Sequence, residues 1–415
     1  MDVERGGLDF CATPATGARA ARAERQLAAL DAREDTVRAF ACHDADAARR
    51  HLATQAGGPL GGALIGVKDI ITTQGFPTRY GLDDTCPTGP RHDAWCVARA
   101  RALGGVILGK TVCTAFAFPR PGPTTNPHDV RRSPGGSSSG SAAAVAAGFV
   151  SFAFGTQTAG STIRPASYCG VVGFKPSFGL LPTEGIEPIS TTLDHVGVFA
   201  MSPRDAWFLV SAMLLRQPKV VAARKPRRVL MPRLPPELPQ EDGYPDRLGA
   251  LALALQADGI AVDAFDLPVE AADFRSLQQE ICHWEAARLL LASPRMRRVP
   301  ELVELLKPYL DSDPTRYISA RRRRQMLQTR FDDFAAGYDA VLLPAATGVA
   351  PPVTATGDAV MNRLWTVLHV PAVTVPIWRS AAGLPLGLQL VGPLGTDRAL
   401  IETAQWFHES QVVAP

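Results

Sequence analysis

The stretch that decides the fold is Ser133–Gly173, SPGGSSSGSAAAVAAGFVSFAFGTQTAGSTIRPASYCGVVG. No charged residue occurs between Ser133 and Ile163, yet the stretch is rich in Ser, Gly, Thr and Gln. A solvated linker does not need the apolar insert AAAVAAGFVSFAF, and a plain core segment does not need so many hydroxyl groups. Both properties are expected of a buried site that is built from serines and backbone N–H groups.

The pattern within this stretch predicts two polar loops on either side of one helix–strand unit. The Pro-Gly-Gly turn near its start breaks regular structure, and its glycines allow successive amides to form an anion-binding concavity. A helix is predicted through the Ala-rich run to Gly148, followed by a strand at Val150–Phe154. The second polar loop, Gly155–Ser161, comes next. We therefore expect Ser137 and Ser161 to converge.

Three other interpretations of the stretch are conceivable. A membrane span is rejected because the apolar run Ala142–Val150 has nine residues, against about eighteen required. The run Gly136–Gly140 fits the G-x-S-x-G pattern of a nucleophile elbow, with Ser138 central, but that motif needs a strand directly before it. The third interpretation is a glycine-serine loop that has no catalytic role. If this stretch is considered alone, that interpretation is favoured over an active site.

A lysine earlier in the chain favours a catalytic role for the serine-rich stretch over a plain loop. Lys68 lies in the middle of the apolar segment Gly61–Ile71, where a cation is costly to bury unless it is paired or neutral. The alternative role is structural, with Lys68 paired to Asp69. Two serine-bearing loops and a buried lysine are nevertheless the parts of a serine–lysine nucleophile system.

These segments resemble the amidase signature family, which joins a strand lysine to a GGSS[GS]G loop and a second loop that ends in G-S. The matching segments are Val67–Asp69, Gly135–Gly140, Ala159–Ser161 and Pro165–Pro176, with a looser match from Tyr338–Pro344 to Leu384–Gly392. The resemblance implies an α/β fold, a single α/β/α sandwich around a large mixed β-sheet. It also implies one amidase domain over residues 1–415, with the signature core at 60–200 and a mostly helical peripheral region at 232–335.

The resemblance assigns roles position by position. Ser161 matches the nucleophile, Ser137 the bridging serine that follows a cis peptide bond, and Lys68 the base. The amides of four residues match the oxyanion hole: Thr158, Ala159, Gly160 and Ser161. Departures from the family pattern are Gln157 where Asp is common, Ala159 where Gly is common, and Ala115 where Glu is usual.

Arg164 is the candidate substrate-binding residue. It follows Ser161 by three positions, as in malonamidase-like members, whereas many other members carry arginine at the position of Ile163. A buried guanidinium needs an anionic or hydrogen-bonding partner. That partner is either a substrate carboxylate or a protein carboxylate such as Asp194 or Glu184, and the resemblance favours the substrate.

Composition sets the remaining limits. The 415 residues are 46% hydrophobic and 20% charged with a net charge of +3, which gives no reason to expect binding to nucleic acid or to an anionic membrane. The seven cysteines are scattered and the eight histidines show no metal-ligand spacing, so we expect no metal and no cofactor. Met1–Arg5 carries both signs of charge without an apolar run, and cytoplasmic localisation is expected. A homodimer is compatible with the sequence.

The rest of the chain alternates between helical and strand patterns, many strands lacking period-2 polarity, which predicts a sheet covered on both faces. Helices are expected at 18–53, 93–103, over most of 247–330 and at 397–408, and strands at 106–108, 229–231, 340–343, 372–376 and 386–391.

Three further motifs are interpreted as structural. Gly104–Thr111 fits the phosphate-loop pattern, but its Val-Ile-Leu centre is typical of a strand rather than a flexible loop. Asp194-His195 suggests a triad, yet a hydrogen-bonded structural histidine is the commoner case. The run Arg321–Arg324 is expected to be the solvated face of a helix rather than an RNA site.

The predicted function is hydrolysis of a small carboxylic amide to an acid and ammonia, with a carboxylate-bearing, malonamate-like substrate that Arg164 would bind. The alternative is a glutaminase-type subunit of an amidotransferase, which would work with partner subunits. A non-catalytic binding protein is a third possibility, raised by the departures at Gln157, Ala159 and Ala115.

Overall fold

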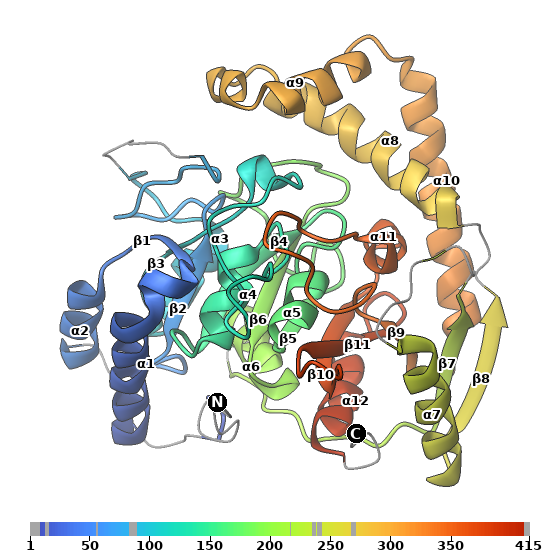
Figure 1. The fold of residues 1–415 in the computed structure, drawn as a ribbon, viewed down its shortest axis with the longest axis horizontal. Coiled ribbons are helices and arrows are strands. Elements are labelled where there is room, and N and C mark those ends of the chain that lie inside the picture. The colour runs from blue at the N-terminus through green and yellow to red at the C-terminus, as the bar shows by residue number, and fades with distance from the viewer. Residues whose placement is uncertain are drawn as a thin grey trace.

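The computed structural model describes residues 9–12, 16–54, 57–82, 89–215, 217–234, 238, 243–266 and 271–410. Its centre is one eleven-stranded sheet in the order β1-β3-β2-β4-β6-β5-β10-β11-β9-β7-β8 (Figure 1). The strands are β1 Phe40–His43, β2 Leu64–Lys68, β3 Val106–Thr111, β4 Phe152–Gln157, β5 Val172–Lys175, β6 His195–Ala200, β7 Arg228–Arg233, β8 Ala261–Asp266, β9 Ala340–Pro344, β10 Ala372–Arg379 and β11 Pro385–Val391.

The sheet is mixed. Strand β2 pairs parallel with both β3 and β4, and β7 pairs parallel with β8 and β9. The strands between β4 and β9 pair antiparallel. The central strands are buried along their whole length, which explains why they appear as continuous apolar runs in the sequence.

Helices cover both faces of this sheet. The α-helices of the described chain are α1 Thr16–Val37, α2 Ala45–Thr54, α3 Trp95–Ala102, α4 Ser139–Ala146, α5 Ile163–Cys169, α6 Pro203–Leu214, α7 Tyr244–Ala257, α8 Ala271–Leu290, α9 Pro300–Leu306, α10 Pro314–Ala335, α11 Val360–Val367 and α12 Asp397–Glu409. None of them is long and apolar enough to cross a membrane.

Two apolar clusters form the layers. One joins α1, α4 and α5 to the sheet through apolar residues such as Leu27, Ala143 and Phe149. The other joins α3, α6 and α12 to the opposite face through Val97, Leu209 and other residues. The predicted α/β/α sandwich around a large mixed sheet is therefore confirmed.

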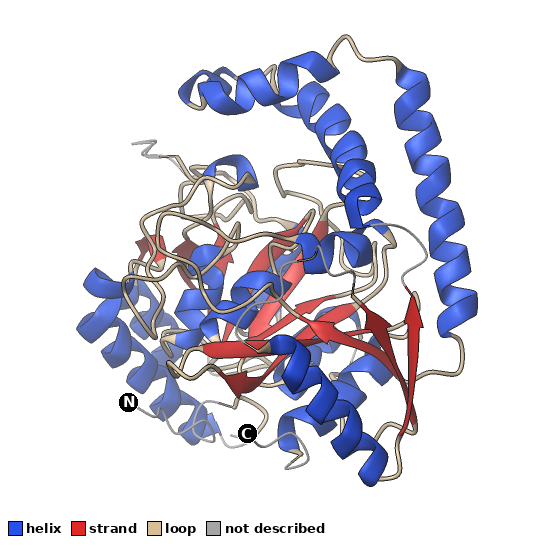
Figure 2. Cartoon of the chain, turned by 45° about the vertical axis from the view of Figure 1, so that its right-hand side comes forward, coloured by secondary structure: helices blue, strands red, loops and turns tan. Residues whose placement is uncertain are grey.

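A third cluster lies under the helical arm that α8, α9 and α10 form beyond the sheet (Figures 1 and 2). Here α8 and α10 pack on α11 through Phe274, Leu327 and Trp365. The expectation that 247–330 is mostly helical missed β8, which extends the sheet at its edge. Because β8 is an edge strand and half exposed, its sequence AVDAFD lacks the apolar run of a central strand.

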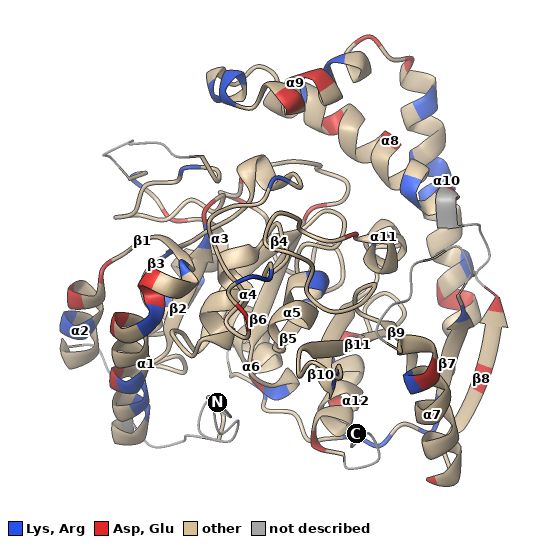
Figure 3. Cartoon of the chain, viewed as in Figure 1, with Lys and Arg blue, Asp and Glu red and all other residues tan. Residues whose placement is uncertain are grey.

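Other expectations have clear outcomes. Strand β1 interrupts the predicted helical region 18–53. The phosphate-loop pattern falls on β3, whose residues Gly109 and Lys110 belong to the strand, so the structural interpretation is confirmed. Of Arg321–Arg324 on α10, all but Arg324 are exposed, which agrees with a solvated helix face (Figure 3). Part of the peripheral region expected at 232–335 lies outside the described residues.

Candidate active site

The site lies where β2 and β4 end. These strands pair parallel, with Val67 opposite Phe154, so their carboxyl ends reach the same edge of the sheet. Lys68 is the last residue of β2, and Gln157 is the last residue of β4. The two polar loops of the sequence therefore meet beside the lysine.

Lys68 is completely buried and hydrogen-bonded to two hydroxyl groups. Its Nζ lies 2.7 Å from Ser137 Oγ and 2.7 Å from Thr156 Oγ1. Burial lowers the pKa of Lys68 to about 8, because the uncharged amine needs less solvation. Asp69 is not its partner: that carboxylate lies 3.4 Å from Lys110 Nζ. The structural alternative for Lys68 is thus wrong.

The serines of the first loop divide into two kinds. Ser137 follows a cis peptide bond from Gly136 and contacts Lys68. Ser138, Ser139 and Ser141 donate to the backbone oxygens of Thr156, Val112 and Phe154, respectively, and are buried. A nucleophile elbow must expose its serine, so the rejection of Ser138 as a nucleophile agrees with its burial.

Ser161 precedes the first turn of α5 and shares a cavity of about 610 Å³ with Ser137. Its loop is fixed by Gln157, whose Oε1 accepts from the amides of Thr162 (2.8 Å) and Ile163 (3.1 Å). The Gln157 Nε2 donates to Thr366 Oγ1 at 3.0 Å. Glutamine thus accepts two backbone bonds, as a carboxylate would, and donates one as well.

The loop expected to form the oxyanion hole is held through its outward-facing groups. Thr158 Oγ1 donates to Asp194 Oδ1 at 2.6 Å, and Thr158 O accepts from Gln278 Nε2 at 3.2 Å. Thr366 Oγ1 donates to Ala159 O at 2.7 Å. Within the described residues, the amides of Ala159, Gly160 and Ser161 donate to no other group. Free amides on a fixed loop are what an oxyanion site requires.

Asp194 is a site residue that the sequence did not reveal in this role. Besides Thr158, its carboxylate accepts from the amides of Ile189 (2.8 Å) and Ser190 (2.9 Å). Burial raises the pKa of Asp194 to about 6. The neighbouring His195 is buried in β6, and its Nδ1 lies 2.6 Å from Leu193 O, which confirms a structural histidine.

Arg164 lies in the first turn of α5, 5% exposed, and borders the cavity. Its Nη2 donates to Gly136 O at 2.6 Å, and its Nε has no hydrogen-bond partner. Asp194 instead binds Thr158, and no ion pair joins Arg164 to Glu184 among the described residues. Burial lowers the pKa of Arg164. Within the part of the chain that the structure describes, no carboxylate forms an ion pair with this guanidinium, although the charge of Asp358 acts on it from a distance.

The far wall of the cavity comes from the helical arm and from α11. Residues of these elements and of the loop before α11, which lie more than a hundred positions after Ser161 in the sequence, complete the lining: Arg275, Gln278, Gln279, Cys282, His283, Asp358 and Arg363. The sequence predicted none of them: 232–335 was expected to be peripheral, and no local pattern in α8 or near α11 indicates which face borders the cavity.

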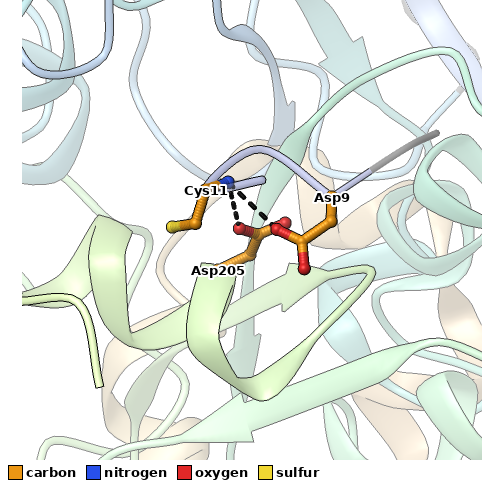
Figure 4. Close-up of side chains that lie close together, drawn as sticks. All are labelled: Asp9, Cys11 and Asp205. Atoms are coloured by element: carbon orange, nitrogen blue, oxygen red, sulfur yellow. Dashed lines mark hydrogen bonds between the residues drawn. The ribbon is translucent and has the colours of Figure 1, made fainter. Parts of the chain in front are cut away.

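One cluster has the ligand atoms of a metal site. Asp9, Cys11 and Asp205 each have one side-chain ligand atom, and these three atoms lie within 4.8 Å of one another (Figure 4). The Asp205 carboxylate already accepts from the amides of Phe10 (2.7 Å) and Cys11 (2.9 Å), and the buried guanidinium of Arg22 lies over the Phe10 ring. A nearby cation and occupied oxygens oppose metal binding. The cluster fits a structural role better, tying residues 9–12 to α6.

The known proteins that resemble this chain include amidases and amidotransferase subunits. The family model described as Amidase matches residues 14–241 and 251–401. A curated relative, the A subunit of the glutamyl-tRNA(Gln) amidotransferase of Anaeromyxobacter sp. (strain K), is 30% identical, covering 92% of this chain and 91% of its own. A crystal structure of an amidase aligns with a TM-score of 0.83 at 30% identity, covering 94% of this chain and 95% of its own. A peptide amidase from Stenotrophomonas maltophilia aligns at 0.82 and 27%, covering 98% and 97%.

Proposed function

This chain belongs to the amidase family, and from that premise we propose that it hydrolyses a carboxylic amide through an acyl intermediate on Ser161. The observation that carries the proposal is the hydrogen bond between the buried Lys68 and Ser137, at the edge of the cavity that Ser161 shares. The products would be a carboxylic acid and ammonia or an amine.

The proposed relay starts from neutral Lys68. With a pKa of about 8, about one Lys68 in ten is uncharged at pH 7, against about one in 2,500 for an ordinary lysine. Lys68 takes the proton of Ser137, which in turn takes the proton of Ser161 as its oxygen attacks the amide carbon. The proton then returns through the relay to the leaving nitrogen as the C–N bond breaks. Water attacks the ester in the second half-reaction and restores Ser161.

The amides of the loop would stabilise the oxyanion of both tetrahedral intermediates. The candidates are Thr158, Ala159, Gly160 and Ser161. Hydrogen bonds that hold the carbonyl oxygens of Thr158 and Ala159 from behind support this role, since they fix the peptide planes before the substrate binds.

Arg164 is proposed to bind a carboxylate of the substrate, two or three carbons from the amide carbonyl, as in malonamate. Its place one turn after Ser161 and its unpartnered Nε support this role. The finer resemblance to malonamidase-like members is not supported by the curated relatives, which include amidotransferase subunits.

Those relatives favour a second candidate function, a glutaminase-type subunit of an amidotransferase. Such a protein would release ammonia from glutamine and pass it to a partner. Co-purification with partner subunits and activity restricted to glutamine would support this candidate; hydrolysis of simple amides by the isolated chain would oppose it.

The test of the mechanism uses three single variants, Lys68→Ala, Ser137→Ala and Ser161→Ala, with Ser276→Ala on the exposed side of α8 as the matched control. We expect amidase activity to be lost in the three variants and kept in the control. A fluorophosphonate probe should label the wild-type chain and the control but not Ser161→Ala. Full activity in Ser161→Ala would overturn the mechanism.

A further inference from the structure

The active-site cavity carries an excess of positive charge. Among the described residues that line it, the charged ones are three arginines and one aspartate: Arg164, Arg275, Arg363 and Asp358. His283 also borders it, but burial lowers the pKa of His283 to about 4, so the ring is neutral. Asp358 forms an ion pair with Arg275 at 2.7 Å, and its negative charge also acts on Arg164 and Arg363 without a hydrogen bond to either. The described lining therefore has two more positive than negative charges, and Arg164 and Arg363 are the cations without an ion pair.

These two guanidiniums have only neutral hydrogen-bond partners among the described residues. Arg164 donates to the carbonyl of Gly136, and Arg363 donates through Nη1 to Gln278 Oε1. The Nε of each is buried without a partner. Burying an unpaired charge is costly, and the cost falls when an anion reaches it. The cavity thus has the electrostatics of an anion-binding site.

A purely structural role for Arg363 explains less. Through Gln278, whose Nε2 donates to Thr158 O, Arg363 is connected to the proposed oxyanion loop. The hydrogen bond to Gln278 uses one N–H of Arg363, and a neutral donor could form the same bond. It leaves the charge and the Nε of Arg363 unexplained.

We propose that Arg363 on α11 and Arg164 on α5 bind the carboxylate of the substrate together, and that the substrate is a monoamide of a dicarboxylic acid without an ammonium group. The inference rests on the proposed amidase function and names its substrate class. Paired N–H groups of an arginine match a carboxylate in geometry, and two arginines can engage both of its oxygens.

The absence of a free acid in the described lining argues against a zwitterionic amino-acid amide. Asp358, the acidic side chain of that lining, is held by Arg275. A substrate ammonium group would therefore have to compete for Asp358 while lying near two unpaired cations. Unpaired charge in a desolvated site is a common basis of discrimination.

Three amides that differ at one group test the inference. Glutaramate carries the carboxylate, pentanamide has a methyl group in its place, and glutamine adds an α-ammonium group to glutaramate. We expect kcat/KM to be at least tenfold higher for glutaramate than for either of the others, since one hydrogen bond to a charged group is worth about a 10- to 100-fold change.

Variants of Arg363 test whether the preference for glutaramate depends on this residue. Arg363→Gln should lower the glutaramate-to-pentanamide ratio of kcat/KM about 10- to 100-fold, mainly through KM, and Arg363→Lys should restore part of it. The control is Arg323→Gln on α10, where Arg323 pairs with Asp273 at 3.1 Å, away from the cavity lining; it should keep the wild-type ratio.

Two results would overturn the inference: glutamine as good a substrate as glutaramate, or an equal loss on glutaramate and pentanamide in Arg363→Gln. Either result leaves the proposed function intact as long as the fluorophosphonate probe labels Ser161. Failure of the proposed function looks different, because then none of the three amides is hydrolysed and Ser161 is not labelled.

Discussion

Two buried lysines, each at the end of a strand of the same sheet, differ in whether they can act as a catalytic base. Lys68 ends β2 and Lys175 ends β5, and both side chains are completely buried. Burial lowers the pKa of Lys68 to about 8 and that of Lys175 to about 7. By burial and pKa alone, Lys175 is as good a candidate for the base as Lys68, because either amine would be partly uncharged at neutral pH.

The difference lies in their partners. Lys68 contacts the hydroxyls of Ser137 and Thr156, whereas Lys175 Nζ donates to the carbonyl of Val370 at 2.5 Å and to that of Pro176 at 3.3 Å. A hydroxyl group can give up a proton to a neutral amine, but a carbonyl oxygen has none to give. A lowered lysine pKa therefore indicates a functional site only where the lysine contacts a proton donor that borders a cavity.

The largest expected effect separates the two lysines directly. Lys68→Met should lower kcat/KM for an amide about 10²- to 10⁴-fold, the usual contribution of a positioned base. Lys175→Met should keep kcat/KM per folded molecule and change only the unfolding midpoint, since its ammonium group contacts backbone carbonyls. The measurements are steady-state kinetics and thermal unfolding by circular dichroism.

The comparison would fail if both variants lost activity to the same extent while each remained folded. If Lys175→Met does not fold, the comparison uses Lys175→Gln instead, because glutamine can still donate a hydrogen bond to Val370 O.

The pH dependence sharpens the same comparison. The base must be neutral to act, so kcat/KM should rise about tenfold per pH unit below the pKa of Lys68 and level off above about pH 8. Lys175→Met should show the same midpoint, because Lys175 is not part of the relay. A rise centred near pH 6 would instead point to Asp194, whose pKa burial raises to about 6.

The smallest expected effect concerns the support of the nucleophile. Gln157→Leu leaves the amides of Thr162 and Ile163 without their acceptor, which should cost about 1–3 kcal/mol of stability and lower kcat by displacing Ser161. Gln157→Glu keeps the acceptor and should lose less of both. Chemical denaturation and kcat measured on the two variants check this, and equal losses in both would show that the acceptor is not the important group.

Sequence patterns predicted the parts of the site that depend on local chemistry. An uncharged run full of serines, and a lysine inside an apolar strand, are costly unless they are buried for a purpose, and both Ser137 and Lys68 lie where that argument placed them. The layered fold was equally predictable, because its central strands are apolar along their whole length.

Edges and distant walls were not predictable in this way. Strand β8 is half exposed and carries no strong pattern, and the cavity face of α8 shows no local sign of its role. These features depend on contacts between segments far apart in the chain.

By itself, then, the sequence determined which residues had to be buried together: the uncharged serine loops, Lys68, and the strands that enclose them. Only the tertiary structure decided the partners. It placed Lys68 against Ser137 rather than Asp69, left Arg164 without a carboxylate, and brought Arg363 to the cavity from about two hundred residues away. The reason is physical: the cost of burial is a property of each residue, whereas a hydrogen bond depends on where the assembled sheet and helices place its two ends.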